Sequence, residues 1–119
     1  MPITANYLFI VSMDVEPDKE DLFNEIYDTE HVPNILKVPG VISATRSAVV
    51  PVDVNIGGSH RTLNADGEPR YQVIYELERP DVMVSEAWAK WAERGRWPDE
   101  VRPFTKNRRH VVRKVKTPR

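Results

Sequence analysis

The sequence predicts an α+β protein in which an antiparallel sheet carries two helices on one face. Three observations support this prediction. The elements expected along the chain follow the order β-α-β-β-α-β, the first strand is apolar on both of its sides, and each helical segment has a single apolar stripe. With 119 residues, the chain is expected to form one domain, residues 1–119, with a core of its own.

The first half of the chain predicts a strand, a helix and a second strand. Residues 7–15 are apolar at both odd and even positions, which is typical of a central strand covered on both faces. Asp18 is expected to cap a helix over about residues 19–30, whose buried stripe is Leu22, Phe23 and Ile26. Pro33 bends or ends this helix, and Pro39-Gly40 precedes a strand over residues 41–52.

The second half predicts a long connection followed by a strand, a helix and a last strand. Residues 53–69 are polar and carry two glycine turn signals, so a lid, a binding loop or a disordered segment is expected. The remaining elements are a strand over residues 70–77, a helix from Pro80 to about Gly95, and a strand over residues 106–115. The β-α-β-β-α-β order is that of the ferredoxin-like arrangement.

One face of such a sheet lacks a helical layer. Because the strand over residues 7–15 is apolar on both sides, water is a poor neighbour for the uncovered face. A symmetric homodimer that packs sheet against sheet covers it. We therefore expect a homodimer.

Composition excludes several classes of protein. The chain has no cysteine, which removes disulfides and thiolate sites, and no apolar run approaches the length of a membrane span. The absence of a visible secretory signal fits a cytoplasmic protein. The net charge of −1 is divided between an acidic segment, residues 14–30, and a basic one, residues 102–119. We interpret these as two solvated surfaces or as a mutually attracting helix and strand, because no motif for nucleic-acid binding accompanies them.

Four polar side chains share the spacing i, i+3, i+4, i+7 and are expected on one side of the first helix: Asn24, Tyr27, Asp28 and His31. His31 is the leading candidate for acid–base chemistry, with a structural role at the helix end as the alternative. Asp28 either orients the imidazole or is solvated. Tyr27 either donates to an oxyanion or belongs to the core, and Asn24 either holds a ligand carbonyl or is a surface amide.

Further candidates for substrate binding lie elsewhere in the chain. Arg46 on the second strand either pairs with a substrate carboxylate or is a surface charge. His60 in the long connection either closes over a ligand or is a mobile surface histidine. Trp88 and Trp91 either stack on a ligand or fill the core, and Ser12 lines the pocket if it faces the helices.

The motif Asn24-x-x-Tyr27-Asp28-x-x-His31-x-Pro33, followed by Val38-Pro39-Gly40-Val41 and Arg46, resembles the dimeric α/β-barrel superfamily and, within it, the EthD-like proteins. The resemblance implies a homodimer whose two sheets form a shared barrel, with a ligand pocket in each subunit between sheet and helices. Members include cyclases, isomerases, lyases, monooxygenases and haem-degrading proteins. Two departures are Ile26, where many relatives have tryptophan, and the length of residues 53–69.

These features favour a cofactor-independent enzyme of aromatic compound catabolism that acts on a small oxygenated organic acid, an aromatic or a polyketide-like compound. The expected chemistry is proton transfer by His31 in an isomerase, cyclase, lyase or ester hydrolase. A non-catalytic binding protein and a monooxygenase, cofactor-free or haem-linked, are the alternatives, with His31 or His110 available as an axial ligand. No metal site is expected, because no set of histidines and acids has a familiar ligand spacing.

Overall fold

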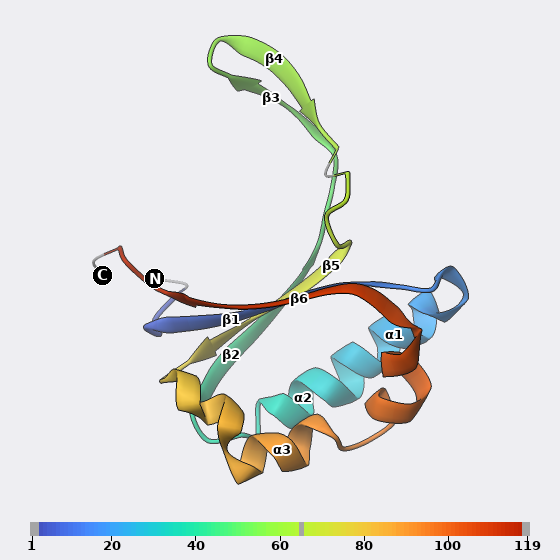
Figure 1. Cartoon of the computed structure of the whole chain (residues 1–119), viewed down its shortest axis with the longest axis vertical. Coiled ribbons are helices and arrows are strands. Elements are labelled where there is room, and N and C mark those ends of the chain that lie inside the picture. Colours follow the sequence, from blue (N-terminus) through green and yellow to red (C-terminus); the bar gives the residue numbers. More distant parts are fainter. Residues whose placement is uncertain (1–2, 65, 118–119) are drawn as a thin grey trace.

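The computed structural model describes residues 3–64 and 66–117. Four antiparallel strands form the main sheet in the order β2-β5-β1-β6, and the helices lie on one face of it (Figure 1). The bounds of these elements are β1 (Tyr7–Val15), α1 (Glu20–Ile26), α2 (Val32–Ile35), β2 (Val41–Ala48), β5 (Tyr71–Leu77), α3 (Glu86–Ala92) and β6 (Thr105–Lys114). The ferredoxin-like α+β fold predicted from the sequence is confirmed. Within the described ranges, no helix is both long enough and apolar enough to cross a bilayer.

The core lies between the sheet and the helices. On β1, Val11, Met13 and Val15 are buried on the helical side. They pack with a stripe from α1 that includes Phe23 and Ile26, as the helical periodicity predicted. Leu8 and Ile10, on strand β1, are only partly buried, so the face without helices keeps apolar surface in the single chain.

The first helical segment differs from the prediction at both ends. A 3₁₀ turn, η1 (Pro17–Lys19), precedes α1, and Asp18 makes no cap. The helix does not end near residue 30. It passes through a π-helical turn, η2 (Tyr27–His31), and continues as α2 beyond Pro33. Proline is tolerated in a first helical turn, and the wider π turn, closed by Val32 N–H to Tyr27 O, starts a new helix at that point.

The second helical segment is also divided. A 3₁₀ turn, η3 (Pro80–Val84), is followed by α3, whose first turn is capped by the Ser85 hydroxyl accepting from Trp88 N–H at 3.2 Å. After Gly95, which has φ +78°, the chain forms a second π turn, η4 (Trp97–Val101), and a 3₁₀ turn, η5 (Arg102–Phe104). The prediction of one helix from Pro80 to about Gly95 is wrong. Serine is favoured at a helix N-cap and less favoured inside a helix, so Ser85 begins a new helix instead of continuing the first turn.

Residues 53–69 are not a structureless connection. Strand β2 ends at Ala48, and the chain then forms a hairpin of β3 (Val52–Ile56) and β4 (Ser59–Leu63), turned by Gly57 and Gly58 at positive φ. We call the hairpin Val52–Leu63 the arm. It projects from the sheet on the side opposite the helices (Figure 1). The radius of gyration, 16.0 Å, exceeds the roughly 13.5 Å expected for a compact chain of this length, as a projecting arm requires.

Candidate functional site

A cavity of about 170 Å³ lies between the sheet and the helices. Its walls come from β1, β5 and β6 on the sheet side and from η2, α2, α3 and η4 on the helical side. Aromatic rings dominate the lining, and the polar groups among them are few: Tyr27, His31, Tyr75, Arg102, Arg108 and His110. The cavity is open to solvent on one side and combines aromatic walls with polar groups, as small-molecule sites do.

His31 occupies the wall formed by η2. Only 8% of its surface is exposed, and its ring stacks on Trp97 with centroids 4.6 Å apart. Its Nδ1 is buried and has no hydrogen-bond partner among the described residues. Burial, reinforced by the positive charge of Arg102 and only partly opposed by Glu93, lowers the pKa of His31 to about 4. The imidazole is therefore neutral near pH 7 and is able to accept a proton.

Tyr27 and Tyr75 form a second polar group in the cavity. Their hydroxyls share a hydrogen bond, and burial raises the pKa of Tyr27 to about 12, against the opposing effects of that bond and of the Arg46 charge. Burial also raises the pKa of Tyr75 well above its usual value. Both phenols are thus neutral donors. The Tyr27 ring meets His31 edge to face, with centroids 5.1 Å apart, so this phenol and the imidazole share the helical wall, while Tyr75 comes from the sheet side.

The four polar residues predicted to share one side of the helix separate into two pairs. Tyr27 and His31 line the cavity, whereas Asn24 and Asp28 face strand β2. There the Arg46 guanidinium donates to Asn24 Oδ1 at 2.8 Å and to Asp28 Oδ1 at 2.6 Å. Asp28 therefore pairs with Arg46 rather than with the imidazole. The Arg46 guanidinium thus donates its hydrogen bonds to side chains of the helix. Its central carbon also lies 4.9 Å from the centre of the Tyr27 ring.

The other predicted site residues are dispersed. Trp88 lines the cavity and meets Phe9 edge to face at 5.7 Å. Trp91 lies outside it, beneath the ammonium of Lys37 at 4.6 Å. Ser12 is buried beneath the open face of the sheet, where it accepts a hydrogen bond from Gln72 at 3.3 Å. His60 is exposed on the arm, 3.9 Å from Asp53, and does not line the cavity.

Most lining residues were not predicted to bind substrate, among them Trp97, Arg102, Arg108 and His110. The two from β6, Arg108 and His110, have a sequence signal, because alternate residues of a strand share a face and His110 pairs with Val11 of the core. Burial and the Arg108 charge lower the pKa of His110. Trp97 and Arg102 have no such signal. They reach the cavity through the turns η4 and η5, and Arg102 is held there by a bidentate ion pair with Glu93.

Comparison with known proteins supports the fold but gives no assignment by sequence. No protein-family model matches the chain, and no curated protein sequence matches it. Among solved structures, a mutant of MhuD with two manganese protoporphyrin IX bound per active site is 15% identical with a TM-score of 0.63. The match covers 94% of this chain and 96% of that one.

Two further solved structures share the fold. An EthD family protein from Bacillus halodurans is 11% identical with a TM-score of 0.58, over 92% of this chain and 99% of that one. The heme-degrader MhuD from Mycobacterium tuberculosis, with two hemes bound in its active site, is 15% identical with a TM-score of 0.56, over 94% and 97%. Identities this low establish a shared fold alone. That fold is the one implied by the resemblance to EthD-like proteins.

Proposed function

We propose that the cavity binds a small aromatic or oxygenated organic acid, and that His31 moves a proton on it in a cofactor-independent isomerisation, cyclisation, elimination or ester hydrolysis. One observation carries the proposal: a neutral imidazole with an unpartnered, buried Nδ1 in the wall of a cavity. Buried polar atoms usually have partners, and a buried histidine that lacks one and lines a cavity is a candidate for function.

The cavity lining supports the ligand class. Phe9, Trp88 and Trp97 provide aromatic walls, and Arg102 and Arg108 provide positive charge. A volume of about 170 Å³ is below the roughly 300–1,000 Å³ of sites for drug-sized ligands, which favours a compound with a single ring. A planar acid with one carboxylate matches both the walls and the charges.

The same groups divide the chemistry between them. The imidazole of His31 takes a proton from the atom next to a substrate carbonyl and later returns it to another atom of the substrate. One phenol of the Tyr27–Tyr75 pair donates its hydroxyl to the other, and the remaining O–H donates a hydrogen bond to the oxygen on which negative charge develops. A bound carboxylate also offsets the Arg102 charge that lowers the pKa of His31, so binding makes the imidazole a stronger base.

A haem-linked monooxygenase is the second candidate, favoured by the solved structures that share the fold and hold haem or a manganese porphyrin. The side chains fit in part, since His31 and His110 are candidate axial ligands and Arg102 and Arg108 would suit carboxylates. The volume does not fit, because about 170 Å³ is too small for a tetrapyrrole. We therefore derive no step through haem. Among the described residues, no group of three or more histidines and acids is placed to hold a metal ion.

A thermal-shift screen followed by proton exchange tests the proposal. Single-ring carboxylates and haem are titrated into wild type, His31→Ala and, as control, His60→Ala, whose histidine lies on the arm. A carboxylate at 100 times its Kd should stabilise wild type and His60→Ala by about 2.7 kcal/mol. His31→Ala should respond less. Compounds that bind are then incubated in D2O, and deuterium uptake next to the carbonyl is followed by NMR.

Each outcome has a distinct meaning. Binding with deuterium uptake that is lost in His31→Ala supports the enzyme. Binding without uptake supports the non-catalytic binding protein instead. A Soret band on haem titration that weakens in His31→Ala favours the haem-linked alternative. Equal responses of wild type and His31→Ala to every compound would overturn a site at His31.

We also propose that the chain forms a homodimer through the face of the sheet that the helices leave open. The apolar centre of this face is formed by Leu8, Ile10, Ile74 and Val111, and Val111 is 41% exposed. A symmetric second copy removes this surface from water on both chains at once.

A further inference from the structure

The two sides of the arm differ in character. The register of the hairpin puts Val52, Val54 and Ile56 of β3 on one side, together with Leu63, Arg61 and Ser59 from β4, so this side is mainly apolar with one charge opposite Val54. Val52, Ile56 and Leu63 are 45%, 50% and 44% exposed. The arm therefore carries an apolar side that the described part of its own chain leaves largely uncovered.

The opposite side of the arm is polar and supplies its own partners. Asp53, Asn55, His60 and Thr62 share it. The Thr62 hydroxyl donates to Asp53 at 2.7 Å, and His60 lies 3.9 Å from the same carboxylate. An isolated two-stranded hairpin is at best marginally stable in water. Contact on the apolar side, not on this one, would add the missing stability.

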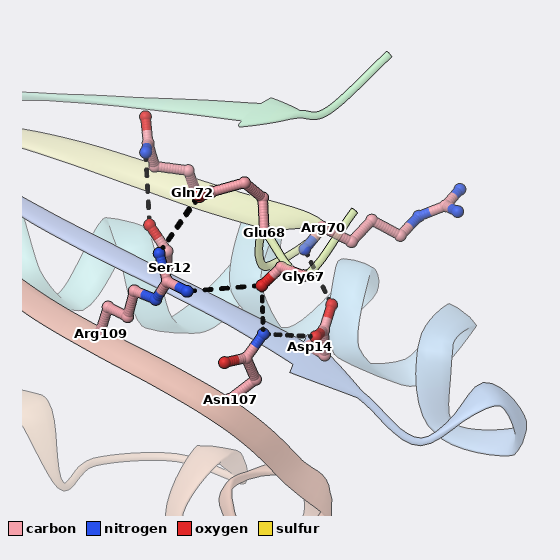
Figure 2. A network of polar contacts seen from close by, with 8 residues as sticks. All are labelled: Ser12, Asp14, Gly67, Glu68, Arg70, Gln72, Asn107 and Arg109. Atoms are coloured by element: carbon pink, nitrogen blue, oxygen red, sulfur yellow. Dashed lines mark hydrogen bonds and ion pairs between the residues drawn. The ribbon is translucent and has the colours of Figure 1, made fainter. Parts of the chain in front are cut away.

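Between the arm and β5, the chain is tied to the main sheet by a polar network (Figure 2). Asp14 accepts hydrogen bonds from Arg70 N–H at 2.8 Å and from Asn107 Nδ2 at 3.1 Å. Asn107 Nδ2 and Arg109 Nη2 both donate to Gly67 O, at 3.3 and 3.4 Å. Asn107 has φ +52° beside the bulge between β1 and β6. These contacts fix the segment that enters β5, four residues and more after the end of the arm.

The arm and the open sheet face border the same side of the molecule (Figure 1). Four strands about 4.8 Å apart, with about seven paired residues each, cover roughly 450 Å² in projection. A stable interface buries about 800 Å² of accessible surface per partner. Accessible surface is larger than projected area, so the sheet face supplies much of such an interface, and the arm adds further apolar surface beside it.

We propose that the apolar side of the arm packs against a second copy of this chain, whose open sheet face lies against the open face here. In a two-fold symmetric pair each arm reaches past the joined sheets onto the other chain, so the contact is made twice. This inference rests on the proposed homodimer. It adds that the arm, Val52–Leu63, is the segment that contacts the partner.

A matched pair of variants tests the arm. Ile56→Lys places a charge on the apolar side, whereas Asn55→Lys places the same charge one residue away on the polar side. Dimer dissociation constants are measured by sedimentation, with circular dichroism to verify folding. Ile56→Lys should raise the constant at least tenfold, and Asn55→Lys should leave it within about twofold.

The outcomes separate the arm from the dimer. An Ile56→Lys dimer as tight as wild type would overturn the role of the arm and leave the sheet-to-sheet dimer standing. A wild-type chain that is monomeric at all concentrations tested would overturn both. The ligand and proton-exchange experiments on the cavity would remain valid in either case.

Cross-linking identifies what the arm contacts. Because the chain has no cysteine, Ile56→Cys introduces a single attachment point for a benzophenone maleimide. Mixed ¹⁴N- and ¹⁵N-labelled chains are irradiated, and the linked peptides are identified by mass spectrometry. With equal amounts of the two labels, mixed-isotope peptides should approach half of the links for Ile56→Cys and be rare for Asn55→Cys. Links confined to a single chain would mean that the arm folds back on its own molecule, which contradicts the proposal.

Discussion

His31 is neutral because of its surroundings. Burial removes the water that would stabilise an imidazolium, and Arg102 adds a repelling charge. The two effects together outweigh the attraction of Glu93 and lower the pKa to about 4. As a consequence, between pH 6.5 and about 4 the unfolded chain binds a proton at His31 that the folded protein does not bind.

The first prediction is a loss of stability in acid. The unfolded imidazole has the ordinary pKa of 6.5 and the folded one about 4, so between these values the unfolded state binds more protons. Stability therefore falls as the pH drops from 6.5 to about 4, by roughly 3 kcal/mol from this group. Urea unfolding of wild type and His31→Gln at pH 7.5 and 4.5 measures it. The variant should lose less stability on acidification.

Two controls sharpen that measurement. His110, whose pKa burial also lowers, contributes in the same direction and keeps part of the acid sensitivity in His31→Gln. His60→Ala removes an exposed histidine and should behave as wild type. If wild type and His31→Gln lose equal stability, the imidazole is not protected from protons as the structure indicates.

The second prediction concerns turnover with whatever acid the screen identifies. His31→Ala should reduce kcat by on the order of 10²–10⁴, because it removes the group that carries the proton. Tyr27→Phe should reduce kcat with little change in KM, because its hydroxyl acts on charge that develops in the transition state. Steady-state kinetics of both variants measures this. A kcat of His31→Ala equal to that of wild type would contradict the assigned role.

At the scale of elements, the π turn η2 decides which side chains meet. It begins directly after α1 and ends directly before α2, so the residue spacing changes from α-helical to π-helical where Tyr27 and His31 line the cavity. Asn24 and Asp28 remain on the side of β2, where Arg46 joins helix and strand. Arg46 thereby fixes the segment that carries the site.

The third prediction follows from this contact. Arg46→Lys loses the planar fork that reaches Asn24 and Asp28 together, and it should lower the free energy of unfolding by about 1–2 kcal/mol. Arg79→Lys is the control, because its pairs with Glu78 and Asp81 are exposed and should contribute little. Chemical denaturation compares the two. Equal small effects would mean that Arg46 does not hold the helix to the strand.

The sequence predicted those elements whose pattern is local. The strand over residues 7–15 and the apolar stripe of Phe23 and Ile26 were correct, because burial on each side shows directly in residue type. The grouping of Asn24 with His31 failed because it assumed 3.6 residues per turn through a segment that is π-helical.

Other features depended on contacts between distant segments. Trp97 stacks on His31 although the two residues are 66 positions apart in the sequence. No local sequence pattern predicts such a contact. The arm did have a local signal in the alternation of Val52, Val54 and Ile56 before a glycine pair, but the polar composition of residues 53–69 outweighed it. His31 was proposed for acid–base chemistry from its spacing to Asn24, Tyr27 and Asp28 and from the family resemblance; it lines the cavity, and its chemical role stays a prediction.

At the scale of the whole molecule, the two faces of the sheet have different partners. The helices cover one face and enclose the cavity. The other face keeps a partly exposed apolar centre, and the arm stands beside it. A chain built this way buries its remaining apolar surface only by association.

Strand β6 offers a matched test of which face associates. Val111 and Val112 are neighbours with nearly equal exposure, 41% and 42%, and they lie on opposite faces of the strand. Val111 pairs with Ile10 on the open face, whereas Val112 pairs with Phe9, whose ring contacts Trp88 on the helical side. In the isolated chain, arginine at either position therefore meets similar solvent.

The fourth prediction is that Val111→Arg dissociates the dimer and Val112→Arg does not. In a sheet-to-sheet dimer the first substitution buries two charges near the symmetry axis without partners, at a cost of several kcal/mol, whereas the second stays in solvent. Light scattering over a range of concentrations measures the mass, and the thermal midpoint should rise with concentration in wild type and Val112→Arg only. A Val111→Arg dimer as stable as wild type would exclude the open face as the interface, since a charge there could not remain buried without weakening the pair.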